Sequence, residues 1–244
     1  HNFNVSVGAS ELFMQAVSKG EHYELKDPHD GEVLGTLNAG EVFDNIIEGA
    51  WLNGEPGTIF LDRVNQDNPT PHLGEMIATN PCGEQPLLAY ESCNLGSINL
   101  AKFVLFDGDE AKVDWDRLAE VTSITTRFLD NVIDANRYSV PAIEEMTKMT
   151  RKTGLGVMGF ADMLVMMNVA YNSQAGLDLG RAIMRFVREH ADATSEELAE
   201  ERGVFPGYEG SIYEKQGRLM RNACRLTVAP TGTISMIAGC SSGI

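Results

Sequence analysis

Apolar residues recur at helical spacing over much of the chain, and short apolar runs separate the helical stretches. Because predicted strands alternate with predicted helices, the pattern indicates an α/β fold with parallel strands. Residues 21–38 carry turn signals and predict a hairpin or loop. The predicted helices cover residues 11–19, 41–53, 115–136, 141–152, 160–167 and 173–202, and the predicted strands cover residues 3–7, 58–61, 93–100 and 225–229.

The pattern also predicts which residues begin the helices and which face the core. Ser10, Asp114 and Ser139 are predicted N-caps, and Gly20 and Gly54 are predicted helix ends. Residues 58–61 form an apolar run typical of a buried strand. The predicted inward-facing residues are Val121, Ile124, Phe128 and Val132 in the helix over 115–136, and Leu177, Ile183, Phe186, Val187 and Leu198 in the helix over 173–202.

Residues 65–92 show little periodicity, although they include many apolar groups. Four of the nine prolines fall in this stretch: Pro69, Pro71, Pro81 and Pro86. A long irregular segment inside a compact domain usually has a function. We therefore expect residues 65–92 to form an extended loop with a role in the chemistry.

Composition excludes some functions and favours a reducing compartment. The net charge is −16, and no basic face is visible that could neutralise nucleic-acid phosphates, so we expect no DNA or RNA partner. No apolar stretch is long enough to span a bilayer, and no signal peptide precedes the first strand, which indicates a cytoplasmic protein. The histidines form no cluster and the four cysteines lack zinc-ligand spacing, so we expect no metal site.

The first candidate site is the segment Asn80-Pro81-Cys82-Gly83-Glu84. In an extended loop, alternate side chains project to the same side, so Asn80, Cys82 and Glu84 would converge on one small ligand. They would supply an amide, a redox-active sulfur and a carboxylate base. The alternative, which local composition favours, is a buried structural cysteine in a proline-braced turn.

The second candidate is Cys93, at the start of a predicted strand. A second thiol near Cys82 would allow redox exchange, but sequence spacing does not show that the two approach each other. A core cysteine is the alternative, and it is the more common case.

The third candidate is the segment Pro230-Thr231-Gly232-Thr233-Ile234-Ser235, a turn into a predicted helix. A helix N-terminus offers free backbone N–H groups and a positive dipole end, and three hydroxyls add donors. The segment would therefore suit a phosphate or diphosphate. An ordinary helix cap explains it about equally well.

A fourth segment, Gly154-Leu155-Gly156-Val157-Met158-Gly159, matches the dinucleotide fingerprint G-x-G-x-x-G. That motif requires a preceding strand, but residues 144–152 are predicted to be helical. Close chain packing or a tight turn explains these glycines better.

Six segments, taken in order, resemble the large catalytic chain of ribonucleotide reductases, and the likeness spans nearly the whole sequence. The amino-acid sequence of residues 80–87 looks most like that of the adenosylcobalamin-dependent class. The segments are Phe3-Asn4-Val5-Ser6-Val7, Gly57-Thr58-Ile59-Phe60-Leu61-Asp62-Arg63, Asn80-Pro81-Cys82-Gly83-Glu84-Gln85-Pro86-Leu87, Glu91-Ser92-Cys93-Asn94-Leu95-Gly96-Ser97-Ile98-Asn99-Leu100, Gly154-Leu155-Gly156-Val157-Met158-Gly159-Phe160-Ala161-Asp162 and Ala229-Pro230-Thr231-Gly232-Thr233-Ile234-Ser235.

The resemblance implies that residues 1–244 are part of a ten-stranded α/β barrel, with residues 65–92 as a central finger loop that carries the radical cysteine. By this likeness, Cys82 would become a thiyl radical and take the 3′ hydrogen of a ribonucleoside di- or triphosphate. Glu84 would be the base for the 3′ hydroxyl, and Asn80 would hydrogen-bond the sugar hydroxyls. Cys93 would be half of the reducing thiol pair, and residues 230–235 would hold the substrate phosphates.

The same resemblance implies adenosylcobalamin as cofactor, a thioredoxin-like dithiol reductant, and a homodimer when the protein is complete. The partner thiol of Cys93, the allosteric loop and the C-terminal shuttle cysteines would lie outside these 244 residues. We therefore expect the barrel domain to be incomplete at both ends, and the isolated chain to be inactive. Two other hypotheses stay open: a non-catalytic split fragment that complements another chain, and a generic nucleotide-binding module.

Overall fold

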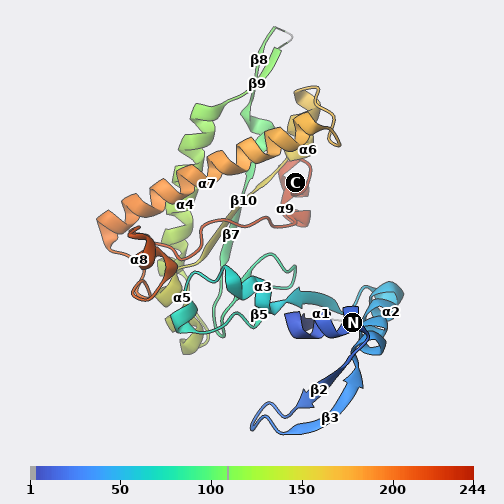
Figure 1. Ribbon diagram of the computed structural model, residues 1–244. Coiled ribbons are helices and arrows are strands. Elements are labelled where there is room, and N and C mark those ends of the chain that lie inside the picture. Colours follow the sequence, from blue (N-terminus) through green and yellow to red (C-terminus); the bar gives the residue numbers. More distant parts are fainter. Residues whose placement is uncertain (1–3, 109) are drawn as a thin grey trace. The chain divides into compact units, whose positions relative to one another are not determined.

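The computed structural model describes residues 4–108 and 110–244, and its chain divides into two compact units (Figure 1). Unit 1 comprises residues 1–68 and 75–88, and unit 2 comprises residues 69–74 and 89–244. Phe3, the first residue of a predicted strand, lies outside the described residues. In the described part, the strands form five two-stranded sheets, of which two are parallel and three antiparallel. The mixed α/β class is confirmed.

Unit 1 pairs β1 with β4 in parallel and carries the antiparallel hairpin β2–β3 that the turn signals predicted. Ser10 caps α1 by accepting a hydrogen bond from the Phe13 amide at 3.1 Å. Gly20 and Gly54 end α1 and α2 in the left-handed conformation, as predicted. The elements are β1 (Ser6–Ala9), α1 (Glu11–Lys19), β2 (His22–Lys26), β3 (Val33–Asn38), α2 (Ala39–Asn53), β4 (Gly57–Phe60), α3 (Leu61–Gln66), β5 (Ala78–Thr79) and β6 (Pro86–Leu87).

The prediction that residues 58–61 form a buried strand was only partly right. Strand β4 covers Gly57–Phe60, and Leu61 already belongs to α3. Phe60 is 47% exposed. The apolar run correctly marked a strand, but β4 lies in a two-stranded sheet that leaves much of its surface uncovered within the described residues.

Unit 2 is built on the parallel pair β7–β10, with helices α4 and α7 packed against each other beside it (Figure 1). Its elements are a 3-10 turn (Pro71–Leu73), β7 (Asn94–Asn99), a 3-10 turn (Leu100–Phe103), β8 (Val104–Asp107), β9 (Glu110–Val113), α4 (Trp115–Ala135), α5 (Pro141–Thr150), β10 (Thr153–Met158), α6 (Phe160–Met166), α7 (Gln174–Arg202), α8 (Ile212–Gln216) and α9 (Gly232–Ala238).

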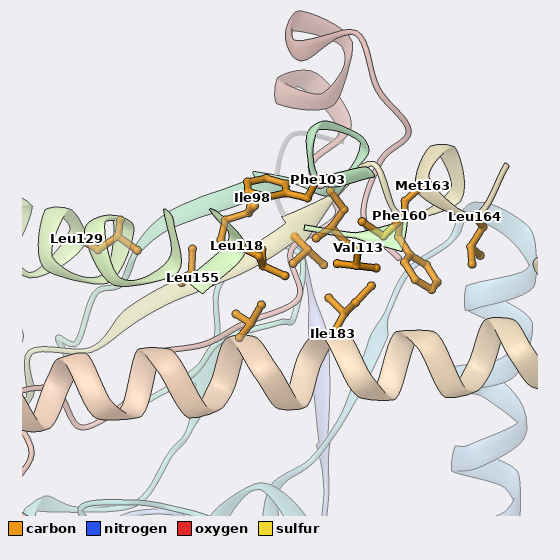
Figure 2. Close-up of a cluster of buried hydrophobic side chains, with 13 residues drawn as sticks. Ile98, Phe103, Val113, Leu118, Leu129, Leu155, Phe160, Met163, Leu164 and Ile183 are labelled. Carbon is orange, nitrogen blue, oxygen red and sulfur yellow. The ribbon is translucent and has the colours of Figure 1, made fainter. Parts of the chain in front are cut away.

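The hydrophobic core of unit 2 lies between the strand pair and α7 (Figure 2). Leu155 and Val157 from β10 are fully buried, and Ile183 reaches the same cluster from α7. Burying such aliphatic side chains contributes roughly 1.5–3 kcal/mol each. The core therefore fixes β10 between the helices.

The apolar stripe predicted for α4 was only partly right, because Val121 packs against the core but two of its other members do not. Ile124 and Phe128 are each 60% exposed. The buried face instead includes Thr122 and Thr126, whose hydroxyls donate to the backbone carbonyls four residues earlier at 2.7 and 2.8 Å. These polar residues can be buried because their hydrogen bonds are satisfied inside the helix.

Three further sequence predictions need correction. Leu177 is 54% exposed, whereas Ile183, Val187 and Leu198 of the same predicted face are buried. Helix α5 is capped by Val140 rather than Ser139, with Pro141 in its first turn. It ends at Thr150 instead of continuing to Lys152, because Arg151 adopts a left-handed conformation with φ of 46°.

The predicted strand over 225–229 is reduced to one isolated bridge, between Leu226 and Leu155. This segment is still hydrogen-bonded to β10: the Cys224 carbonyl accepts from Thr153, and the Thr227 amide donates to Leu155. Pro230 has no N–H with which to extend such a ladder. The hairpin β8–β9 was not predicted at all, although Asp107-Gly108 is a turn signal.

The glycines of residues 154–159 lie in and directly after β10, so they do not form a phosphate-binding turn. A Cβ on Gly156 would lie 2.6 Å from the Thr227 carbonyl oxygen. Close chain packing is therefore the reason for this glycine, as the sequence analysis favoured, and the preceding segment is a helix as predicted.

A buried carboxylate, that of Asp130 on α4, joins four parts of unit 2. Its side chain is fully buried and accepts from Arg151 at 2.9 Å, from Asn222 at 3.0 Å and from Arg202 at 3.1 Å. Arg151 also holds Asp134, and this hydrogen bond lowers the pKa of the Asp134 carboxyl. The network explains why Arg151 keeps its left-handed backbone.

Replacing Asp130 with alanine is expected to destabilise the protein by about 3–5 kcal/mol, because buried guanidinium groups would lose their counter-charge. Asp178→Ala is the matched control, since Asp178 pairs with Arg181 on the surface of α7 and should change stability little. Urea unfolding of the two variants, made in the full-length parent protein, measures the change in stability of each. Equal midpoints for the two variants would contradict a structural role for the buried network.

Candidate active site

The segment that contains Cys82 is a tight turn between β5 and β6 in unit 1. The Asn80 amide donates to the Gln85 carbonyl at 3.2 Å, and the Gly83 amide donates to the Asn80 carbonyl at 3.0 Å. Gly83 has a φ of 85°, which favours glycine. Residues 80–85 are therefore a hairpin turn, and the expectation that they form an extended segment was wrong.

Because the segment is a turn, alternation along an extended chain does not bring Asn80, Cys82 and Glu84 together. The Asn80 carboxamide oxygen instead accepts from the Gln85 amide at 3.0 Å and closes the turn. Cys82 lies exposed in this turn, and Glu84 is half-buried beside it. The alternative of a buried structural cysteine is also wrong for Cys82 in this unit.

The turn is anchored and opens on a pocket. Asn4 donates from its side chain to the Pro81 carbonyl at 2.9 Å, which ties the turn to the segment before β1. A pocket of about 450 Å³ lies beside Cys82, and its lining includes the polar side chains of Ser6, Thr58 and Arg63. Its size is typical of small-ligand sites.

Cys93 lies in unit 2, immediately before β7. Its thiol donates weakly to the Asn94 carbonyl at 3.4 Å, and it lines a small pocket of about 80 Å³ together with Asn136 and Tyr138. The preceding residue, Ser92, shares a hydrogen bond of 2.6 Å with Thr147 on α5. The cysteine is half-buried, so it is neither a core residue nor a surface thiol.

Residues 230–235 make the predicted turn into a helix, α9, in unit 2. Thr231 has a φ of 55°, and its hydroxyl accepts from the Gly243 amide at 2.8 Å. Its side chain makes no capping bond to α9, so the ordinary side-chain cap that we considered is absent at this position. Thr233 and Ile234 are exposed, whereas Ser235 is buried and donates to the Gly232 carbonyl at 3.3 Å.

The candidate residues thus divide into two groups. Unit 1 holds Asn80, Pro81, Cys82, Gly83 and Glu84, and unit 2 holds Cys93 and residues 230–235. No group of three His, Cys, Asp or Glu side chains suited to a metal ion occurs among residues 4–108 and 110–244. Within the same residues, no helix combines the length and apolarity that crossing a membrane requires.

Comparison with known proteins decides the family. A family model described as "Ribonucleotide reductase, barrel domain" matches residues 1–219. The chain belongs to the ribonucleotide reductase family. The resemblance seen in the six motifs is thereby confirmed.

Among the relatives, a "Vitamin B12-dependent ribonucleoside-diphosphate reductase" of Thermoplasma acidophilum is 51% identical over 243 residues, which cover 100% of this chain and 31% of that relative. A protein of the same name from Mycobacterium tuberculosis is 48% identical, with 100% and 34% covered. A "Ribonucleoside-diphosphate reductase subunit alpha" of Chlamydia pneumoniae is 31% identical, with 92% and 25% covered. The chain therefore spans about a third of the length of the first two relatives.

Sequence reasoning missed the contacts that surround Cys93 in this member of the reductase family. Glu91 and Lys152 form a buried ion pair of 2.7 Å, and Ser92 pairs with Thr147. Glu91 and Ser92 belong to a recognised motif, but their partners are more than fifty residues away in sequence. The only sequence signal was two charged residues, Glu91 just before a predicted strand and Lys152 at the end of a predicted helix.

Thiol reactivity should separate Cys240 from the redox candidates. Partial burial, together with the nearby Asp162 carboxylate, raises the pKa of the Cys240 thiol, so less of it is thiolate at neutral pH. In timed iodoacetamide labelling followed by mass spectrometry, we expect Cys240 to react more slowly than the exposed Cys82 and to accelerate as pH rises. Labelling of Cys240 at neutral pH as fast as that of Cys82 would contradict this assignment.

Proposed function

We propose that this chain is the catalytic segment of an adenosylcobalamin-dependent ribonucleotide reductase, which reduces ribonucleoside di- or triphosphates to deoxyribonucleotides. Membership of the family and the names of two relatives that align with the whole of this chain support the proposal. The observation that carries it is the turn of residues 80–85, which presents Cys82 to a pocket of ligand size. In the complete protein, residues 65–92 would be the finger loop of a ten-stranded barrel.

The chemistry assigned to unit 1 begins at Cys82. As a thiyl radical, its sulfur takes the hydrogen atom from C3′ of the ribose and becomes a thiol. Glu84 takes the proton of the 3′ hydroxyl, and the 2′ hydroxyl leaves as water. Asn80 hydrogen-bonds the sugar hydroxyls during this step. The hydrogen atom returns from the Cys82 thiol to C3′ at the end of the cycle, so the thiyl radical on Cys82 is regenerated.

The electrons come from the Cys93 thiol and a second thiol of the full-length polypeptide. Together they supply two electrons and two protons, and they end as a disulfide. A thioredoxin-like dithiol then reduces that disulfide. The N-terminus of α9 and the hydroxyls of residues 230–235 would hold the substrate phosphates. The complete protein would act as a homodimer.

The pocket beside Cys82 fits a cofactor with an adenosyl group. Its lining includes Cys82, Ser6 and Thr58, so a thiol-bearing residue and two hydroxyl-bearing residues border it. The chemistry that adenosylcobalamin supplies when bound is a one-electron oxidant for a thiol. Because a radical must be shielded from solvent, we expect other parts of the full-length polypeptide to cover Cys82 during turnover.

Single-turnover assays of the full-length parent protein, with ribonucleotide and dithiol, test this function. We expect deoxynucleotide only when adenosylcobalamin is present, and none from Cys82→Ser, because a serine hydroxyl does not form the radical. Cys224→Ser is the matched control and should keep the activity, since Cys224 lines neither the pocket at Cys82 nor the one at Cys93. Activity without cobalamin would overturn the cofactor, and activity in Cys82→Ser would overturn the mechanism.

A further inference from the structure

Two side-chain contacts, one buried and one partly buried, hold the two residues that precede Cys93. The ammonium of Lys152 lies 2.7 Å from the Glu91 carboxylate, and the two side chains are 1% and 0% exposed. Ser92 is held from the other side by the hydroxyl of Thr147 on α5, at 2.6 Å. Both residues that precede Cys93 are therefore fixed by side chains distant in sequence.

The ion pair lies at the end of the β7–β10 pair where both strands begin, next to Cys93. Thr153 opens β10 and pairs with Asn94, the first residue of β7. Lys152 directly precedes Thr153, and Cys93 directly precedes Asn94. The Glu91–Lys152 pair consequently joins the two chain segments just outside the ladder, where backbone hydrogen bonds between β7 and β10 no longer hold them.

Stability alone is a weak reason for such a pair. Removing two charges from water is costly, and apolar side chains of similar volume often stabilise a protein as well or better. An ion pair also fixes how its two side chains are oriented, because its geometry allows one arrangement where apolar packing allows several. The pair is thus suited to fixing a position.

We infer that the Glu91–Lys152 pair positions Cys93 for its redox step, an inference that rests on the redox role of Cys93 given above. A disulfide forms only when the two Cα atoms lie within about 4.4–6.8 Å and the Cβ vectors face each other. A segment that moves lowers the effective concentration of one thiol at the other. Glu91 and Lys152 act through Cys93 and are positioning residues.

The experiment compares the stability of the Cys93 disulfide in variants of the full-length parent protein, equilibrated in a dithiol redox buffer. In Glu91→Leu/Lys152→Met, the pair becomes apolar at similar volume. We expect the thermal unfolding temperature to stay close to wild type, while the disulfide equilibrium constant falls about tenfold, which corresponds to about 30 mV. If the pair were merely structural, the variant would change the unfolding temperature and leave the reduction potential of the Cys93 disulfide unchanged.

Two further variants complete the design. Glu144→Gln/Lys148→Met removes an exposed ion pair on nearby α5 and should leave the potential unchanged. Glu91→Lys/Lys152→Glu restores a pair with reversed charges and should recover most of the lost disulfide stability. If the apolar variant does not fold, Glu91→Gln/Lys152→Gln, which keeps hydrogen-bonding groups at both positions, takes its place with the same expected fall.

A wild-type potential in the folded apolar variant would overturn the positioning role. The same holds if the reversed pair recovers nothing, because the effect would then come from lost packing. Failure of the proposed function is a separate outcome, visible in the wild-type protein alone. If turnover leaves no disulfide at Cys93 there, the redox role of this cysteine is wrong, whatever the variants do.

Discussion

The buried carboxylate of Asp130 is the interaction on which the arrangement of unit 2 depends. It takes hydrogen bonds from Arg151 after α5, from Arg202 at the end of α7 and from Asn222 in the segment that lies along β10. A buried charge is tolerated only when it is paired, so the buried position of this carboxylate depends on these contacts. They determine where α5 ends and where β10 begins, because Arg151 immediately precedes Lys152 and Thr153.

The register of β10 carries this constraint to the candidate site. Thr153 pairs with Asn94, and Lys152 pairs with Glu91, so the backbone on both sides of Cys93 is set by residues that follow α5. In unit 1, the turn around Cys82 is closed locally, by Asn80 and by the left-handed Gly83. One candidate cysteine is therefore placed by tertiary contacts, and the other by the chemistry of a turn.

Much of the fold could be predicted from sequence where local rules decide it. The caps at Ser10 and Asp114, the stops at Gly20 and Gly54, and the span of α7 follow from capping and periodicity. The buried face of α4 could be predicted only in part, because Thr122 is buried with its hydroxyl bonded inside the helix and Asp130 is buried against partners distant in sequence. Motifs pointed to the candidate residues, but they did not predict the side-chain bond that closes the turn at 80–85 or the pairing of Glu91 with Lys152, which are 61 residues apart.

We propose that Cys82 and Cys93 act on one ribose in the full-length protein. A crystal structure of the full-length parent protein with a bound ribonucleotide tests it directly. We expect the Cys82 sulfur to lie within about 3.5 Å of C3′. We also expect the Cys93 sulfur to lie beside the same sugar and the phosphates to lie at residues 230–235. A ribose bound away from Cys82, or Cys93 remote from it, would contradict the account.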